Sequence, residues 1–302
     1  MKLSTENGEL RVRLGDRKTI EMLSKVGFDA IDYGFSPWLE RGEMIWNTDR
    51  YAEYAKEVNM IAKDNGIYFN QAHGPFVFDT SLFPDYSKQV IPLFKRCFEV
   101  CALLNIPHMV VHPIHHLPYK GNEDLLWKIN NDFYRMLLPF SKETGVKIAL
   151  ENMYQYDGKR GVLTTDVFAV PEKYAEFYDQ LNDPHFICLV DTGHCGIVGE
   201  TTERMLRVMG KRIKALHLND NLFRTDDHII PGHGLMNLDQ VMRTLAEIDY
   251  EGDVTFEVLN IYRAYDDSFL ETSARYLHDV GRYIIAKIEG YKNAKKTNKD
   301  NR

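Results

Sequence analysis

The fold can be inferred from a short stretch just past the middle of the chain, Ile-Cys-Leu-Val-Asp at residues 187–191. Its four apolar residues do not alternate with polar ones, and a carboxylate follows them directly. A strand with one face in water would alternate, so this run is typical of a parallel strand that is covered on both faces. Runs of the same kind recur along nearly the whole chain and predict an α/β protein.

Eight such runs alternate with longer amphipathic segments. The predicted strands cover residues 1–4, 30–33, 68–72, 108–111, 147–150, 187–190, 213–216 and 254–256. The predicted helices cover residues 17–25, 48–65, 86–104, 123–143, 165–180, 202–209, 238–247 and 267–288. Gly27, Gly66 and Gly145 stand where a helix ends in a left-handed residue before the next strand. Eight repeats without a linker favour one (β/α)₈ barrel domain over residues 1–288.

A doubly wound nucleotide-binding fold is the alternative arrangement of such repeats. It would normally carry G-x-G-x-x-G after an early strand, or G-x-x-x-x-G-K-[ST], and the sequence has neither pattern. The glycines of Gly232-His233-Gly234 lack the third glycine and come too late in the chain. The barrel is therefore the preferred prediction.

The composition excludes several classes of protein. The 302 residues include 37 Lys and Arg against 44 Asp and Glu, which gives a net charge of −7 and disfavours a basic nucleic-acid coat. No apolar run approaches the roughly 18 residues of a membrane span, and the N-terminus lacks the apolar core of a signal peptide. Four cysteines without a C-x-x-C pair predict reduced thiols in a cytoplasmic protein. The polar, basic tail at residues 289–302 is expected to be disordered.

Polar side chains of metal-ligand type follow six of the predicted strands. They are His73, His112, Glu151, Asp191, His217 and Glu257, and each is separated from the next by 39, 39, 40, 26 and 40 residues. In a parallel barrel the carboxyl ends of all strands surround one mouth, so these side chains should converge there. Burying several carboxylates together is costly unless a cation compensates them. The pattern therefore predicts a divalent metal site.

The ligand types narrow the choice of metal. Glu151, Asp191, Glu257 and His217 give three carboxylates and one imidazole, which suits Mn²⁺, Co²⁺ or Mg²⁺ at least as well as Zn²⁺. Additional imidazoles would favour zinc and decide between one ion and a cluster. The further candidates for metal or substrate contacts are His73, His112, His194, Asp226 and His228.

A series of short motifs resembles the xylose isomerase-like TIM-barrel superfamily. The motifs are Ala-His-Gly-Pro-Phe at 72–76, Val-Val-His-Pro at 110–113, Leu-Glu-Asn at 150–152, Asp-Thr-Gly-His at 191–194, His-Leu-Asn-Asp-Asn at 217–221, Asp-Asp-His at 226–228, Pro-Gly-His-Gly at 231–234 and Phe-Glu-Val at 256–258. The resemblance runs from about residue 19 to residue 283. It is specific for the superfamily, which holds sugar isomerases, ketose 3-epimerases and the endonuclease IV group of AP endonucleases, but it does not select an activity.

In the ketose 3-epimerase branch, the resemblance implies that Glu151, Glu257, Asp191 and His217 hold one divalent metal. It also implies that the two glutamates act as acid and base on opposite faces of a sugar, through a metal-stabilised cis-enediolate. His194 resembles a residue that contacts the sugar oxygens. A silent sugar-binding barrel would be expected to lack one glutamate, and both are present.

In the endonuclease IV branch, nine ligands hold three zinc ions, and the sequence has a candidate for each. They are His73, His112, Glu151, Asp191, His194, His217, Asp226, His228 and Glu257. The flanking residues depart from that group, because Met153-Tyr154 follows Glu151-Asn152 where a small Thr-Ala-Gly-Gln type of loop is typical. We therefore expect a sugar isomerase or epimerase, with the zinc-dependent AP endonuclease as the alternative.

Three aromatic residues follow strands and are predicted to form an apolar wall that shields the reaction from water: Trp38, Phe76 and Tyr154. The expected partner is a small-molecule sugar or sugar derivative, without a membrane or a nucleic acid. The sequence leaves open which sugar binds, whether it carries a phosphate, and whether the chain forms homo-oligomers.

Overall fold

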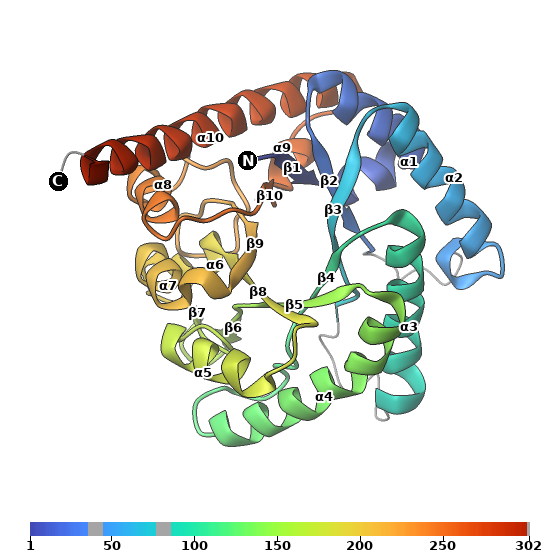
Figure 1. Ribbon diagram of the computed structural model, residues 1–302. Helices are drawn as coiled ribbons and strands as arrows, with labels where there is room; N and C mark the ends of the chain where they lie inside the picture. Colours follow the sequence, from blue (N-terminus) through green and yellow to red (C-terminus); the bar gives the residue numbers. More distant parts are fainter. Residues whose placement is uncertain (36–44, 77–85, 301–302) are drawn as a thin grey trace.

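The computed structural model describes residues 1–35, 45–76 and 86–300, so the predicted wall residue Trp38 lies outside the described part. Within these residues, eight parallel strands form a ring that helices surround (Figure 1). The strands are β1 (Leu3–Glu6), β2 (Ala30–Gly34), β3 (Tyr68–His73), β4 (His108–Val111), β5 (Lys147–Glu151), β8 (Phe186–Asp191), β9 (Ile213–His217) and β10 (Val254–Phe256). The predicted single (β/α)₈ barrel is confirmed.

The sheet runs in the order β10-β1-β2-β3-β4-β5-β8-β9. A parallel bridge between Leu218 and Phe256 joins its two ends, and the Leu218 N–H donates to the carbonyl of Thr255 at 2.8 Å. These contacts close the ring, so the carboxyl ends of the strands surround one mouth. The inner wall carries small and branched side chains, among them Val110, Ala149 and Leu189.

The helices surround the ring, and the longer ones pack their apolar faces against it. They are α1 (Gly8–Val26), α2 (Tyr51–Asp64), α3 (Tyr86–Leu104), α4 (Glu123–Thr144), α5 (Pro171–Leu181), α6 (Thr192–Ile197), α7 (Thr202–Met209), α8 (Leu238–Glu247), α9 (Asn260–Arg263) and α10 (Leu270–Asp300). Short 3₁₀ turns are η1 (Ile45–Asn47), η2 (Gly210–Arg212) and η3 (Asp267–Phe269). Gly27 and Gly145 end α1 and α4 with φ values of 111° and 76°, as predicted.

The segment after β5 differs from the sequence prediction. Residues 154–165 form an antiparallel hairpin of β6 (Tyr154–Asp157) and β7 (Val162–Thr165), and α5 begins at Pro171 rather than at residue 165. The hairpin strands are mostly half exposed, so they lack the apolar runs that mark the barrel strands. Proline at the first position of α5 costs no hydrogen bond and sets its start.

The C-terminal segment also differs from the prediction, because α10 continues as a helix to Asp300 where a disordered tail is expected. Lys295 donates from Nζ to the carbonyl of Glu247 at 2.7 Å and pairs with Asp249 at 3.0 Å. Tyr291 donates from its hydroxyl to Asp239 in α8. These contacts attach the polar end of α10 to α8 and to the turn that follows α8. Sequence composition alone predicts that this segment has no such contacts.

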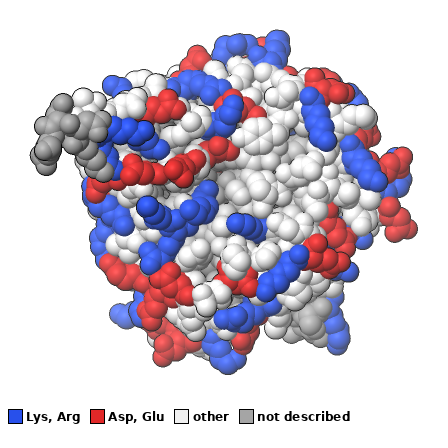
Figure 2. All heavy atoms as spheres, in the orientation of Figure 1, with Lys and Arg blue, Asp and Glu red and all other residues white. Residues whose placement is uncertain are grey.

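The surface carries charges of both signs. On the face of the molecule shown in Figure 2, Lys and Arg are interspersed with Asp and Glu around the rim, and no continuous basic band crosses that face. Among the helices of the described residues, none combines the length and apolarity that a membrane span requires. All four cysteines are buried free thiols.

Candidate metal centre

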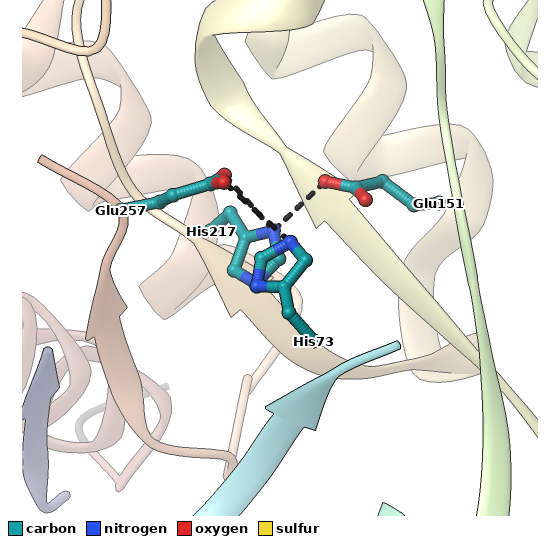
Figure 3. A group of neighbouring side chains, drawn as sticks. All are labelled: His73, Glu151, His217 and Glu257. Carbon is teal, nitrogen blue, oxygen red and sulfur yellow. Dashed lines mark hydrogen bonds and ion pairs between the residues drawn. The ribbon is translucent and has the colours of Figure 1, made fainter. Parts of the chain in front are cut away.

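Four side chains from four strand ends meet at the mouth of the barrel (Figure 3). His73, Glu151 and His217 are the last residues of β3, β5 and β9, and Glu257 directly follows β10. Each of them offers a ligand atom within 4.8 Å of the ligand atoms of the other three. Parallel strands dictate this meeting, since each of the four residues stands at the carboxyl end of its strand.

His217 lies between the two glutamates. Its Nδ1 is 2.8 Å from Glu151 Oε1 and 3.2 Å from Glu257 Oε2, and its ring is fully buried. Figure 3 shows the two carboxylates approaching from opposite sides. The ring of His73 stacks on that of His217 with 4.4 Å between centroids, and His112 Nε2 lies 2.8 Å from Glu151 Oε2.

Asp191, the last residue of β8, is not a member of this group of four, in which His73 stands instead, but it shares Glu151 with the group. It forms a second group of ligand atoms with Glu151 and His194, again within 4.8 Å. Its Oδ1 accepts the N–H of His194 at 2.7 Å as the N-cap of α6, and its Oδ2 accepts the amide of Asn219 at 2.6 Å. Asn152 Nδ2 donates to the Asp191 carbonyl at 3.0 Å. The carboxylate is therefore held in one orientation.

A third group lies beside the first two and contains His194, Asp226 and His228. Asp226 Oδ2 accepts from His228 Nε2 at 2.6 Å and from the Tyr154 hydroxyl at 2.9 Å. His194 Nε2 is 3.7 Å from Asp226 Oδ1, and its Nδ1 is 2.8 Å from the carbonyl of Asn152. All nine residues that the sequence offers as candidate metal ligands thus lie around one mouth.

Two further carboxylates belong to the site, and the sequence analysis missed both. Asp32 in β2 is fully buried, with Oδ2 at 3.1 Å from His217 Nε2 and at 2.9 Å from the amide of Gln71. Glu6 at the end of β1 lines the cavity and is 8 % exposed. Glu6, like the other strand-end residues of the site, is a side chain of metal-ligand type at the carboxyl end of a strand. The sequence analysis missed it because the predicted first strand ends at residue 4.

The pKa values follow from burial of so many carboxylates with so many imidazoles. Burial raises the pKa of Asp191 to about 6, although His194 opposes the rise. Burial would lower the pKa of His73, but Glu257 and Asp32 outweigh it and raise the pKa to about 9. Burial also raises the pKa of Glu6 to about 7, and the charge of Asp32 adds to this. Protons on imidazoles thus compensate the buried negative charge where a cation is not bound.

The donor set fits a divalent cation. Among the described residues, the buried atoms without a hydrogen bond include both ring nitrogens of His73, Glu257 Oε2 and Asp226 Oδ1. Unsatisfied buried polar atoms are costly, and a cation that accepts a lone pair from one nitrogen of His73 and from the two carboxylates lowers that cost. Carboxylate and imidazole donors suit Mn²⁺, Co²⁺, Mg²⁺ and Zn²⁺.

A cavity of about 530 Å³ opens above these donors. Its walls include two of the predicted aromatic residues, Phe76 and Tyr154. The Phe76 ring lies 4.5 Å from that of His112, and the Tyr154 ring lies 4.9 Å from that of His194. The volume suits a small polar molecule rather than a polymer.

Comparisons with known proteins agree with this architecture. The model of the xylose isomerase-like TIM barrel family matches residues 20–279. The chain belongs to this family. The resemblance inferred from the short motifs is confirmed.

Named relatives of this xylose isomerase-like barrel are isomerases and epimerases, in agreement with the predicted enzyme class. An inosose isomerase of Halalkalibacterium halodurans is 26 % identical over 254 residues, covering 80 % of this chain and 82 % of that protein. A D-psicose 3-epimerase of Enterocloster bolteae is 22 % identical over 253 residues, covering 80 % and 76 %. The crystal structure of D-psicose 3-epimerase with D-tagatose from Clostridium cellulolyticum H10 has a TM-score of 0.71 at 18 % identity, covering 94 % and 99 % of the two chains, and shares the fold.

Proposed function

We propose that this protein is a divalent-metal-dependent sugar isomerase or ketose 3-epimerase. The observation that carries the proposal is the pair of carboxylates, Glu151 and Glu257, which approach His217 Nδ1 from opposite sides at 2.8 and 3.2 Å. Glu257 lines a cavity of sugar size, and Glu151 is buried beside it. The names of the relatives support the same class of reaction.

Glu151, Glu257, Asp191 and His217 would hold the metal. When bound, the cation polarises the carbonyl of the sugar and stabilises the negative charge that develops on its oxygen. One glutamate removes the proton from the carbon beside the carbonyl. The C–H electron pair then forms a double bond to the carbonyl carbon, and the π pair of the carbonyl moves onto its oxygen, which gives an enediolate. The other glutamate returns a proton to the opposite face, which inverts the carbon, or a proton returns to the neighbouring carbon, which moves the carbonyl.

The remaining residues of the cavity bind and shield the sugar in this proposal. His194 faces the cavity from α6 and is the candidate for a contact with sugar oxygens. Phe76 and Tyr154 exclude water from the face of the substrate, which strengthens every electrostatic contact inside. Their rings pack on His112 and His194, so the wall and the metal donors support each other.

Metal-dependent AP endonuclease activity is the second candidate, because the nine residues required by that branch lie around one mouth. The charge of the cavity opposes it. Glu6 lines the wall, and an acidic side chain there repels the phosphate backbone of DNA. We therefore favour the sugar enzyme, for which uncharged hydroxyl groups would meet this carboxylate.

The test is solvent-deuterium exchange at the carbon beside the carbonyl, measured by NMR on D-psicose, D-tagatose and D-fructose with Mn²⁺ supplied. We expect Glu151→Gln and Glu257→Gln each to lower the exchange rate by at least about 100-fold, because each removes a proton-transferring carboxylate. Glu21→Gln, an exposed substitution on α1, is the control and should exchange at the wild-type rate.

Two results would contradict the proposal. Exchange at the wild-type rate in both glutamine variants would refute the assigned roles of the glutamates. Two or three tightly bound zinc ions per chain, together with nicking of abasic-site DNA and no ketose exchange, would instead establish the endonuclease. Metal content is measured on protein purified without chelator, and removal of the metal should abolish either activity.

A further inference from the structure

Glu6 is a buried carboxylate in the cavity wall, and one of its oxygens has no hydrogen-bond partner in the described part of the chain. It ends β1 and is 8 % exposed. Its Oε1 accepts the N–H of Gly8 at 2.6 Å. Its Oε2 is buried and makes no hydrogen bond within the described residues. Such an atom carries a desolvation cost that a donor from a bound molecule would remove.

Two glycines leave room for the carboxyl group of Glu6. A Cβ atom on Gly34 would lie 2.4 Å from Glu6 Oε1, and one on Gly8 would lie 2.6 Å from the same oxygen. Both distances are shorter than a real contact permits, so an alanine at either position would displace the end of the Glu6 side chain. Asn7 Oδ1 accepts the N–H of Gly34 at 3.0 Å, and the Gly34 carbonyl accepts from Arg11 at 2.7 Å. These two hydrogen bonds hold the backbone of Gly34 beside the carboxyl group.

Glu6 stands apart from the donors of the metal centre. It belongs to none of the three groups of ligand atoms, although it lines the same cavity as His73 and Glu257. Glu9, the neighbouring acid of the wall, is paired with Arg263 at 2.6 Å and has its charge compensated. Among the described wall residues outside the three groups of candidate metal ligands, Glu6 has a carboxylate oxygen, Oε2, that lacks a hydrogen bond, and its side chain lines the cavity.

We propose that Glu6 is a substrate-specificity residue that accepts a hydrogen bond from one hydroxyl group of a polyhydroxylated sugar, at a carbon away from the reacting ones. The inference rests on the proposed function. It adds that the substrate must carry a hydroxyl group at the position that Glu6 contacts. A buried group that hydrogen-bonds a substrate hydroxyl rejects the analogue without it strongly, because the protein atom is then left unpaired. Sugars that lack this hydroxyl should bind weakly.

The experiment measures sugar binding rather than turnover. Mn²⁺-supplemented protein is titrated calorimetrically with D-psicose and with its mono-deoxy analogues, each lacking one hydroxyl group. Wild type is compared with Glu6→Ala, with the isosteric Glu6→Gln, and with the exposed control Glu21→Gln. Melting curves establish that each variant is folded, and Glu6→Gln retains an oxygen for the Gly8 N–H if Glu6→Ala does not fold.

At about pH 8.5, where Glu6 is ionised, we expect Glu6→Ala to raise the Kd for D-psicose about 10- to 100-fold, the range for a lost hydrogen bond to a charged group. For one deoxy analogue, wild type and variant should bind equally weakly, because the interaction is already missing. Glu6→Gln should give a smaller loss with the same dependence on the analogue, and Glu21→Gln no loss.

Two outcomes overturn the inference. If the Glu6 variants bind every analogue as wild type does, or lose the same factor with all of them, Glu6 does not contact a hydroxyl group. In that case deuterium exchange by wild type still upholds the proposed function. If wild type neither binds nor exchanges any ketose, the proposed function fails and the inference fails with it.

Discussion

Gly193, the third residue of the Asp-Thr-Gly-His motif, offers a test of how the metal centre is held. It lies in α6, where a Cβ atom would stand 1.9 Å from Asn219 Oδ1 and 2.5 Å from Asn221 Nδ2. Ordinary contact begins at 3.4 Å, so Gly193→Ala forces a displacement of about 1.5 Å on Asn219. Both asparagines are fully buried and cannot swing into solvent.

The magnitude follows from what Asn219 does. Overpacking of this kind costs about 1–3 kcal/mol of the free energy of unfolding. Asn219 also donates to Asp191 Oδ2 at 2.6 Å, and losing a hydrogen bond to a charged group costs about 1.5–3 kcal/mol. Because that bond orients a candidate metal ligand, we expect Gly193→Ala to weaken Mn²⁺ binding about 10- to 100-fold.

The assay combines calorimetric titration with Mn²⁺ and chemical unfolding of the metal-free protein. Gly290→Ala is the matched control, since no heavy atom lies within 4 Å of its Cβ position in α10 and alanine favours a helix by up to about 1 kcal/mol. The control should bind Mn²⁺ as wild type does and should be equally or more stable. An unchanged Mn²⁺ affinity in Gly193→Ala would show that Asn219 does not position Asp191.

Two further variants test Asp32, beside the centre, and His108, at the amino-terminal end of β4. Asp32→Asn should weaken Mn²⁺ binding about 10- to 100-fold, because Asp32 Oδ2 orients His217 from 3.1 Å, and an unchanged Kd in the same titration would refute this. Burial lowers the pKa of His108 to about 4, against about 6.5 in the unfolded chain. Neutral His108 therefore contributes stability above pH 6.5 that is lost as the pH falls from 6.5 to 4, up to about 3 kcal/mol. In urea unfolding of chelated protein, the advantage of wild type over His108→Asn should shrink by up to this amount between pH 7 and pH 4, and a constant difference would contradict the assignment.

Most of the barrel and of its mouth could be predicted because both follow from local pattern. A parallel strand buried on both faces needs an uninterrupted apolar run, and a polar residue directly after that run stands at the mouth. Glu151 and Asp191 satisfy both conditions, so their positions could be inferred from residue order alone. The hairpin of β6 and β7 has half-exposed strands and carries no such run, which is why it was missed.

Asp32 illustrates what residue order cannot reveal. Tyr33 and Gly34 continue β2 beyond it, so Asp32 reads as an interior strand residue rather than as the polar residue after a run. The pairing of β2 with β3 shifts between Ile31 and Asp32, where Ile31 pairs with Phe69 and Asp32 with Gln71. Such irregularities re-aim side chains next to functional sites. The contact of Asp32 with His217 depends on that register and on closure of the ring.

The two sides of the barrel mouth differ in composition, and this explains why the metal centre was easier to predict than the substrate. The nine candidate ligands stand at or after the ends of β3, β4, β5, β8, β9 and β10, where their chemical type marks them. The wall beside β1 and β2 includes instead Glu6, whose proposed role depends on space left open by Gly8 and Gly34. Residue type identifies a metal donor, but only the assembled cavity identifies a hydroxyl acceptor. Substitutions at Gly8 or Gly34 should therefore alter the choice of sugar while the metal donors stay in place.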